Sequence, residues 1–556
     1  MTDETRVGQE DVAGGVTVWV EQQVRNTPWW LISIAFHLIV LAGMTVITFQ
    51  DDVKKLDPPQ ITVLPPRAKP DLLPPLRDTV DTAPGWSPKD VPVATEKNDE
   101  PILPNYEDAI DGHKNTSDVD PLVDNDGMRG ESRDLVGAEL GGETGFGRGQ
   151  GGPGVHRELG VGGGAGTGGR WGDPFSDGSR NMRKVGLAGL PKGTTAATEN
   201  AVTYGLRWLA RHQGTDGAWS ADGFHHQCKG TTCTHSGYKE YDAGVTGLSL
   251  LAFLGAGYTH LSKESYTDEV TGKKIRYGDV VKSACKWLIE HQDAEGCFGG
   301  RSGHKYMYNH SIAALAMTEA FGLTNASLFR EPAQRGIDFL AAAQMPYKAW
   351  RYSKNAPDND TSVTGWCVMA MKSAEMAGLQ VSRSSYDGAK NWVSEVTDEQ
   401  YYRTGYTAKN TGKVVVPGKN DDWDNHDAMT AVGMLCRIFI EKNEKDPALV
   451  GGARLLVADL PQYSGKKVDY YYWYYGSLAL FQLDGPKGQF WNGWNTAMVN
   501  ALVPNQKAKA GGCQYGSWDA DVDRWGFEGG RVYSTALNVL TLEVYYRYAS
   551  AFGGKR

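Results

Sequence analysis

The chain has 556 residues and a formal net charge of −9, with 57 Lys and Arg against 66 Asp and Glu. This acidic balance and the lack of a basic stripe exclude nucleic acid as a partner. The length allows one large domain with a substantial core beside other segments.

The N-terminal region predicts one transmembrane helix. Residues 29–49 are 21 residues without Asp, Glu, Lys or Arg, and such a helix spans the roughly 30 Å hydrocarbon core of a bilayer. Trp29 and Trp30 suit the membrane interface, and no signal-peptide cleavage site follows. The flanking charges do not decide the orientation, but the short segment 1–28 favours a cytoplasmic arm. We therefore expect a single-pass protein anchored in the lipid bilayer of the inner membrane, with a periplasmic C-terminal domain.

Two polar residues lie inside this predicted helix. Ser33 and His37 are four positions apart and so share one helix face, and an ionisable residue in the bilayer is a candidate functional group. Their spacing, followed by a Pro-rich stretch, resembles the anchor of TonB-type energy transducers. That resemblance implies an ExbB/ExbD-like motor as a membrane partner. The alternative is an isolated His tolerated near the membrane.

Residues 50–192 have the composition of a disordered linker. Residues 57–104 are Pro-rich and could extend on the order of 150 Å. Residues 90–126 are acidic and polar, and residues 127–172 are Gly-rich. The glycines neither follow a predicted strand nor open a helix, so they predict a spacer and not a nucleotide site.

A phrase recurs in the remaining domain, residues 193–556: an aromatic, an aliphatic, three residues, Gln, and then often Gly, one residue and an aromatic. Its copies lie at residues 208–219, 287–298 and 339–350. Such repetition indicates one supersecondary unit copied along the chain. Before the first Gln, the apolar residues recur at spacings of three and four, which predicts an amphipathic helix.

Each amphipathic outer helix precedes a helix that is apolar nearly all round, which predicts burial on all sides. The expected outer helices span residues 198–213, 276–292, 327–344, 384–397, 446–460 and 487–504. The expected inner helices span residues 242–258, 309–323, 360–377, 424–441, 469–482 and 532–548. These six hairpins predict a closed ring, because an open solenoid needs polar end caps.

The repeated phrase resembles the QW motif of the terpenoid cyclase and protein prenyltransferase superfamily. Residues 359–366 and 469–476 also resemble planctomycete proteins with prenyltransferase and squalene oxidase repeats. This resemblance covers about residues 193–550 and implies an all-α fold, an α6/α6 toroid of six helical hairpins. It implies no particular reaction, because one fold carries many functions.

In this superfamily the inner helices point their N-terminal ends at a central cavity. The residues that this implies for a ligand cavity are Asp242, Asn309, His310, Trp366, Trp423, Asp469, Tyr470, Tyr472, Trp473, Arg531 and Tyr533. The candidate acid–base groups are Asp358, Asp360, Asp424, His426 and Asp427. Single Asp residues at these places also suit helix N-caps, and the aromatics suit helix packing, so a structural role is the alternative.

The known chemistry of the superfamily maps only in part onto this chain. The acid motif of squalene–hopene-type cyclases aligns with residues 357–361, where Asn359 takes the place of the proton donor. A shift by one residue would bring Asp358 there. The zinc ligands of protein prenyltransferases align with Asp469, Tyr471 and Ser534, and Tyr and Ser replace the Cys and His of that site.

Two of the seven cysteines, Cys228 and Cys233, lie among the histidines His225, His226 and His235. Two Cys and three His within eleven residues have zinc-ligand chemistry. A Cys228–Cys233 disulfide, which an oxidising compartment favours, and free thiols are the alternatives. Zinc at this loop is the one cofactor that the sequence suggests.

The resulting expectation is a membrane-anchored toroid that binds an apolar, isoprenoid or glycan ligand in its central cavity. One alternative is an active enzyme of the cyclase or transferase class with a divergent acid–base site. Another is a structural or force-transducing envelope protein coupled to the ExbB/ExbD-like motor.

Overall fold

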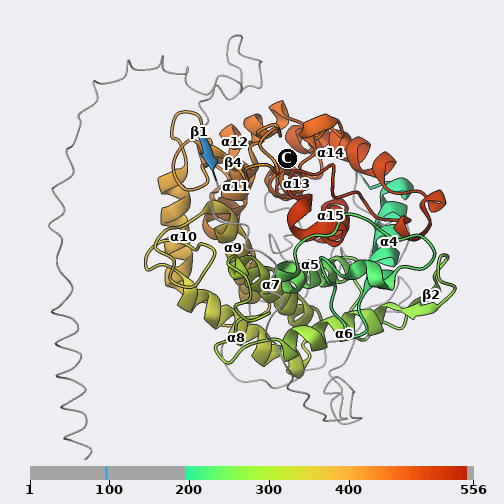
Figure 1. The fold of residues 1–556 in the computed structure, drawn as a ribbon. Coiled ribbons are helices and arrows are strands. Elements are labelled where there is room, and N and C mark those ends of the chain that lie inside the picture. Colours follow the sequence, from blue (N-terminus) through green and yellow to red (C-terminus); the bar gives the residue numbers. More distant parts are fainter. Residues whose placement is uncertain (1–93, 98–193, 548–556) are drawn as a thin grey trace, which may run out of the picture. The chain divides into compact units, whose positions relative to one another are not determined.

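The computed structural model describes residues 94–97 and 194–547 (Figure 1). The predicted arm 1–28, the predicted helix 29–49 with Ser33 and His37, and all of the linker except 94–97 lie outside these residues. Within the described residues, no helix is long and apolar enough to cross a membrane. This finding contradicts the prediction of a single-pass inner-membrane protein, and the TonB-like anchor finds no support in it.

The described residues form outer and inner helices that alternate along the chain. The outer helices are α4 (Ala196–His212), α6 (Tyr277–Glu290), α8 (Ser327–Ala343), α10 (Arg383–Val396), α12 (Pro447–Ala458) and α14 (Gln489–Leu502). The inner helices are α5 (Asp242–Gly255), α7 (Tyr306–Thr324), α9 (Thr361–Met376), α11 (Ala428–Glu441), α13 (Tyr470–Asp484) and α15 (Gly526–Leu542). The short helix α16 (Val544–Arg547) follows.

The inner helices close into a ring. Each one contacts the next along the chain, and α15 contacts α5, so that the last hairpin meets the first. The outer helices surround this ring, as Figure 1 shows. The predicted α/α toroid of helical hairpins is therefore the observed architecture of residues 194–547.

The burial of the two helix types follows their sequences. In α5, every residue from Ala243 to Gly255 is buried, as expected for a helix that is apolar all round. In α10, the buried large side chains Tyr386, Trp392, Val393 and Val396 fall on one stripe. The core therefore lies between the two layers and between neighbouring inner helices.

The repeated phrase connects neighbouring units. The Nε2 atom of Gln292 donates to the carbonyl of Gly296 in its own loop, at 3.0 Å, and to that of Pro332 in the next outer helix, at 2.9 Å. Gln213, Gln344 and Gln506 make the same pair of bonds. For Gln506, the last of them, the next outer helix is α4, and the acceptor is the Ala201 carbonyl at 2.8 Å.

The glycine of the phrase allows neighbouring units to approach closely. Gly217, Gly296 and Gly516 have φ angles of +100°, +101° and +92°, and a Cβ on each would lie 2.2–2.3 Å from a carbonyl oxygen of the next outer helix. The third copy has Lys348 at this position, and there Gly388 of α10 provides the space, since its Cβ would lie 2.4 Å from the Lys348 carbonyl.

Short strands and 3₁₀ helices lie in the connections. Strands β2 (Ser265–Thr267) and β3 (Lys274–Arg276) form an antiparallel hairpin. Within the expected linker, β1 (Ala94–Lys97) is a strand that pairs in parallel with β4 (Thr411–Val415), so these four residues are not disordered chain. The 3₁₀ helices are η4 (Phe224–Gln227), η5 (Lys239–Tyr241), η6 (Gly465–Lys467), η7 (Val503–Asn505) and η8 (Lys509–Gln514).

A buried ion pair connects α16 with the second inner helix. The Nη2 atom of Arg547 lies 2.6 Å from the Oε1 atom of Glu319, and both side chains are fully buried. Arg547 also donates to the phenol oxygen of Tyr474 at 3.3 Å. The pair therefore joins helices of the second, fifth and last hairpins inside the ring.

Candidate functional site

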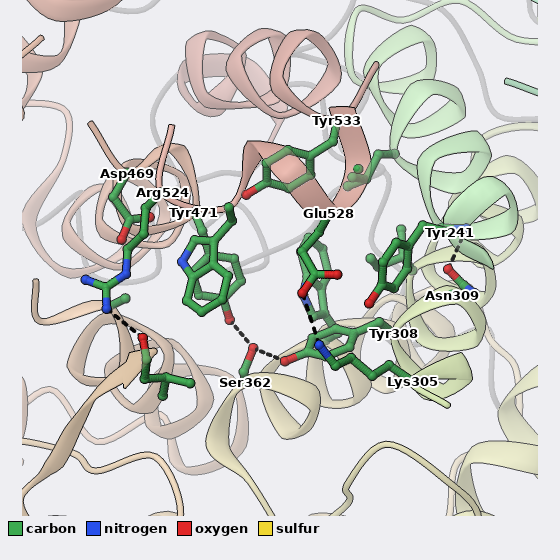
Figure 2. A pocket seen from close by; sticks show the side chains of 18 of the residues that line it. Tyr241, Lys305, Tyr308, Asn309, Ser362, Asp469, Tyr471, Arg524, Glu528 and Tyr533 are labelled. Atoms are coloured by element: carbon green, nitrogen blue, oxygen red, sulfur yellow. Dashed lines mark hydrogen bonds and ion pairs between the residues drawn. The ribbon is translucent and has the colours of Figure 1, made fainter. Parts of the chain in front are cut away.

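The inner helices enclose a cavity of about 160 Å³ at their N-terminal ends (Figure 2). Every inner helix contributes residues of its first turns, such as Gly244 of α5, Asn309 of α7, Ser362 of α9, Met429 of α11 and Tyr471 of α13. The cavity therefore exists because all of these helices begin at the same end of the ring.

Eight Tyr and Trp side chains line the cavity. They are Tyr241, Tyr308, Tyr352, Trp366, Tyr406, Tyr471, Trp525 and Tyr533. A hydrogen-bonded chain crosses this wall: the Tyr308 hydroxyl donates to Ser362 Oγ at 2.8 Å, and Ser362 Oγ lies 2.7 Å from Tyr471 Oη (Figure 2). Burial raises the pKa of Tyr308 and of Tyr471 well above the usual value. Both phenols are therefore neutral groups at neutral pH.

Three charged side chains at the cavity already have protein partners. Lys305 Nζ lies 3.0 Å from Glu528 Oε1, with both side chains about one-fifth exposed. The buried Arg524 donates to the Val414 carbonyl at 2.7 Å and to the Asp424 carbonyl. Among the described residues that line the cavity, each of these three charges thus already has a protein partner.

His426 has one ring nitrogen bound and the other free. Its Nδ1 atom lies 2.6 Å from Asp459 Oδ2, and the ring stacks on Tyr472. The residue lines the cavity and is 7% exposed. Among the described residues, nothing hydrogen-bonds its buried Nε2 atom, nor the buried hydroxyl oxygen of Tyr533, which also lines the cavity. Arg524 Nε, a third buried atom at the cavity, also has no hydrogen-bond partner among the described residues, and a ligand could satisfy these three atoms.

Some of the predicted site residues line this cavity and others do not. Asn309, Trp366, His426, Asp469 and Tyr533 line it. The remaining ones, which lie elsewhere, are Asp242, His310, Asp358, Asp360, Trp423, Asp424, Asp427, Tyr470, Tyr472, Trp473 and Arg531.

The predicted acidic residues outside the cavity have structural partners or face solvent. Asp242 accepts from the Ala221 N–H at 2.7 Å, and burial raises its pKa to about 7. Asp360 caps α9 through the Val363 N–H at 2.7 Å. Asp358 and Asp424 are exposed on the surface. Asp427 is paired with Arg403 at 2.6 Å.

The basic and aromatic residues outside the cavity are also engaged in packing. His310 accepts from the Phe298 N–H and bonds the Gly336 carbonyl, each at 3.0 Å, and burial lowers its pKa to about 4. Arg531 lies 2.5 Å from Asp519. The buried Tyr470, Tyr472, Trp473 and Trp423 belong to the hydrophobic core.

Several lining residues that we did not predict share one helix position. Gly244, Ser362 and Tyr471 each stand two positions after the Asp at the start of an inner helix, and all three line the cavity. This spacing was readable in the sequence. Arg524 and Glu528 come from the loop and first turn that precede the predicted last inner helix, where the expected helix start was too late.

The family-implied zinc site of prenyltransferases does not fit here. Of its three positions, Asp469 accepts from the Tyr472 N–H as the N-cap of α13, Tyr471 binds Ser362, and Ser534 is buried without lining the cavity. Within the described residues, neither group of side chains close enough to hold a metal ion lies in the cavity.

One of those groups is a cluster of His212, Cys228, Cys233 and Cys513, which could hold a metal ion. Cys228 and Cys233 are the predicted pair, whereas His212 and Cys513 were not foreseen. A hydrogen bond from Cys233 lowers the pKa of Cys513 to about 3. All seven cysteines lie in the described range, and none is in a disulfide there.

The histidines predicted beside these cysteines lie elsewhere. His225 and His226 belong to η4, and their rings lie 4.3 Å apart at a tilt of 50°. His235 approaches Asp519 and Asp521 in a second group. Lys507 and Arg531 already pair with Asp519 in that group, at 2.5 Å each, and this disfavours a further cation.

Comparisons with known proteins found similar solved structures. No family model and no curated protein sequence matches the chain. The type II terpene cyclase MstE from Scytonema has 12% identity and a TM-score of 0.39 over 62% of this chain and 97% of that chain. An inactive variant of the alpha-1,6-mannanase GH76A of Salegentibacter sp., in complex with alpha-1,6-mannotriose, has 12% identity and a TM-score of 0.41, over 63% and 98%. The endo-beta-1,4-glucanase CMCax from Acetobacter xylinum has 11% identity and a TM-score of 0.35, over 62% and 98%.

Proposed function

We propose that the toroid binds a carbohydrate and that its cavity takes one sugar ring. The size supports this choice among apolar, isoprenoid and glycan ligands. The cavity of about 160 Å³ is close to the roughly 150 Å³ that accommodates benzene in an apolar protein core. A six-membered ring fits such a volume, whereas a long isoprenoid chain does not.

The single observation that carries the proposal is the set of three unsatisfied polar atoms at the cavity, His426 Nε2, Arg524 Nε and Tyr533 Oη. A buried polar atom left without a partner costs about 1–3 kcal/mol, so an apolar ligand would leave that cost in place. Hydroxyl groups of a sugar both donate and accept, so they can pair with the ring nitrogen in either protonation state, with the guanidinium N–H and with the phenol. The aromatic wall with Trp366 and Tyr471 offers faces for the C–H side of the ring.

The carboxylates that line the cavity support binding of a carbohydrate and not hydrolysis of a glycosidic bond. Hydrolysis uses two carboxyl groups that flank the scissile bond. Glu528 is paired with Lys305 at 3.0 Å, and Asp469 accepts from the Tyr472 N–H at 2.9 Å as a helix cap. Neither group is free to act as the acid or the nucleophile.

The test is a binding titration of the full chain with a panel of mono- and disaccharides and with farnesol as the isoprenoid probe. We expect at least one saccharide to bind in a saturable way and farnesol not to. Tyr533→Phe removes only the hydroxyl and should weaken that saccharide about five- to twenty-fold, the effect of one hydrogen bond.

The matched control is Tyr347→Phe, which also removes one phenol hydroxyl. Tyr347 is 84% exposed and does not line the cavity, so the affinity should be unchanged. Saturable binding of farnesol with no saccharide bound would overturn the proposal. Equal affinities of the wild type and Tyr533→Phe for the saccharide would also contradict it.

A second candidate function is proton transfer to or from the bound ligand, and His426 is the group that favours it. Of the predicted acid–base residues, His426 alone lines the cavity among the described residues. Its partner Asp459 is 38% exposed, so a proton can pass between solvent and the ring. A positioned His contributes typically 10²–10⁴-fold to such a step. His426→Gln should lower turnover of a bound saccharide about 10²–10⁴-fold, more than it weakens binding, and unchanged turnover would contradict this role.

A further inference from the structure

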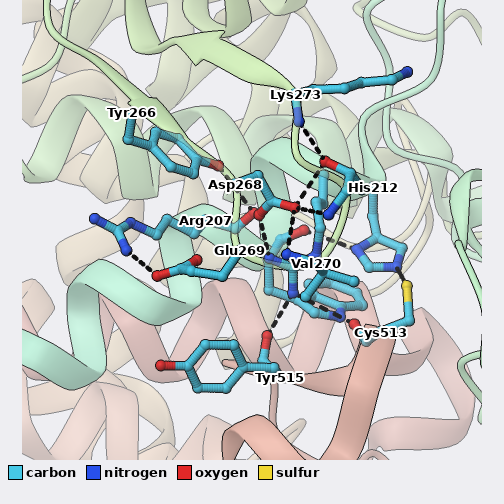
Figure 3. Close-up of polar contacts among 12 residues, drawn as sticks. Arg207, His212, Tyr266, Asp268, Glu269, Val270, Lys273, Cys513 and Tyr515 are labelled. Atoms are coloured by element: carbon cyan, nitrogen blue, oxygen red, sulfur yellow. Dashed lines mark hydrogen bonds and ion pairs between the residues drawn. The ribbon is translucent and has the colours of Figure 1, made fainter.

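Three cysteine sulfurs surround one histidine nitrogen at the seam where the ring closes. The Sγ atoms of Cys228 and Cys233 lie 3.5 Å from His212 Nε2, and the Sγ atom of Cys513 lies 3.4 Å from it. All four ligand atoms lie within 4.8 Å of one another. Figure 3 shows the His212 ring and the Cys513 sulfur facing each other.

These distances match a tetrahedral zinc site. Zinc binds Cys sulfur at about 2.3 Å and His nitrogen at about 2.0–2.1 Å. In a tetrahedron of those bond lengths, the sulfur-to-nitrogen edge is about 3.5 Å, as found here. Four protein ligands of the Cys₃His type leave no open position, which is typical of a structural zinc site and not of a catalytic one.

Hydrogen bonds around the cluster favour metal binding by His212 and Cys228. His212 Nδ1 lies 2.8 Å from the Trp208 carbonyl, which places the ring proton on Nδ1 and leaves the Nε2 lone pair toward the sulfurs. Without a metal, that one lone pair faces three sulfurs. The Cys233 N–H donates to Cys228 Sγ at 3.2 Å, and such a bond stabilises a thiolate. His212, Cys233 and Cys513 are all buried.

The second hairpin provides a natural comparison. His291 occupies the same place in the repeated phrase as His212, bonds the Trp287 carbonyl through Nδ1 at 2.8 Å and stacks on the Trp287 ring. No group of metal-binding side chains forms around His291 among the described residues. The hydrogen bond and the stacking thus belong to the repeat, and the three cysteines are the addition at His212.

We propose that His212, Cys228, Cys233 and Cys513 bind one zinc ion that fastens the first hairpin to the last. His212 ends α4, Cys228 and Cys233 lie in the loop of the first hairpin, and Cys513 lies in the loop before α15. His212 and Cys513 are 301 positions apart. One ion therefore crosses the seam at which the ring closes.

Other contacts at the seam agree with this placement. The Cys513 N–H donates to Thr231 Oγ1 at 3.0 Å, from the loop between the two other cysteines. Arg211, next to His212, donates to the Tyr515 carbonyl at 2.6 Å and pairs with the buried Asp268 at 2.8 Å. The ligands are thus held by a backbone that already joins the two hairpins.

The first experiment measures metal and thiols on the full chain, purified with a reductant from zinc-supplemented cells. We expect about one zinc per chain and seven reactive thiols after denaturation. Replacement by Co²⁺ should give the intense visible bands of tetrahedral cobalt with thiolate ligands. A folded chain without zinc and without those cobalt bands would overturn the proposal, as would two fewer thiols, which indicate a Cys228–Cys233 disulfide.

The second experiment compares matched variants. Cys513→Ala and His212→Gln should lower the zinc content about tenfold, whereas the controls Cys297→Ala and His291→Gln should leave it unchanged. Hydrogen exchange after chelation should speed up in residues 201–213 and 506–518 but not in α9 and α10. Full zinc content in Cys513→Ala would contradict a zinc ion that joins the first and last hairpins.

Discussion

His426 Nδ1 lies 2.6 Å from Asp459 Oδ2, so that a buried imidazole at the cavity is held by a carboxylate that is 38% exposed. Burial lowers the pKa of His426, but the bond with Asp459 outweighs it and the net direction is upward. The folded state therefore favours the protonated ring. This contribution to stability is present below the ordinary pKa of about 6.5 and is lost as the pH rises through the folded value.

From this sign we predict that Asp459→Asn destabilises the protein more at pH 5.5 than at pH 9. The loss at the lower pH should be on the order of 1 kcal/mol, because solvent screens a partly exposed pair. Chemical denaturation at both pH values measures it, with the exposed Asp422→Asn as the control. An equal loss at both pH values would show that His426 is neutral throughout.

Asp360 predicts a second pH dependence in the same direction, from an acid instead of a base. Burial raises its pKa to about 7, although Arg351 pulls it down. An unfolded Asp titrates near 3.9, so wild-type stability should fall as the pH rises from about 4 to about 7. Asp360→Asn keeps a side-chain oxygen that accepts the N-cap hydrogen bond of α9 and removes the negative charge.

We expect Asp360→Asn to match the wild type at pH 4 and to exceed it at pH 8 by about 1–4 kcal/mol. The measurement is the free energy of unfolding across this pH range. A variant that is less stable at pH 8 would mean that the carboxylate form is held by Arg351 after all.

The repeat glycines predict a large effect from one methyl group. A Cβ at Gly296 would lie 2.3 Å from the Arg335 carbonyl oxygen, and φ is +101°. Gly296→Ala should cost roughly 3 kcal/mol, from backbone strain and displacement of α8. Gly378→Ala is the matched control. At Gly378 φ is +79° and no atom lies within 4 Å of the added Cβ, so only backbone strain contributes to the loss of stability. Equal losses of stability in the two variants would mean that the close contact between neighbouring units does not contribute to the effect of Gly296→Ala.

The buried Arg547–Glu319 pair predicts a cost for leaving one charge alone. Arg547→Met should lower the free energy of unfolding by about 3–5 kcal/mol, because Glu319 is then a buried carboxylate without its cation. Lys390→Met, which breaks the 3.2 Å pair with Glu441 where Lys390 is 48% exposed, should change it by less than about 1 kcal/mol. Thermal unfolding of both variants measures the difference.

The helices were predictable because their signals are local. The apolar stripe of α4 and the all-round apolar sequence of α5 are read within one helix each, and the predicted ranges differ from the observed ones by a few residues. Ring closure followed from the apolar last helix. The start of α15 was missed because Gly529 and Gly530 interrupt the pattern, and Gly530 has φ +65°.

The site was harder to predict because its members meet only after the ring has closed. His212 looked like any residue before the repeat Gln, and Cys513 lies 301 positions away. Asp427 and His426 are neighbours in sequence, yet His426 lines the cavity and Asp427 turns to Arg403. A helix start shows which residues are near the cavity end, but one step along the chain rotates a side chain away from it.

The closing contact between Gln506 and Ala201, 305 positions apart, also dictates an order of events during synthesis. Helix α4 leaves the ribosome first among these helices, yet α15, which packs against it, is translated last. At about 5–20 residues per second, the interval is on the order of 15–60 s. During it, the face of α4 at Gly205, to which Val539 of α15 and Trp518 lie close, has no permanent cover. We therefore expect the nascent chain to expose apolar surface at its first hairpin until the final hairpin docks.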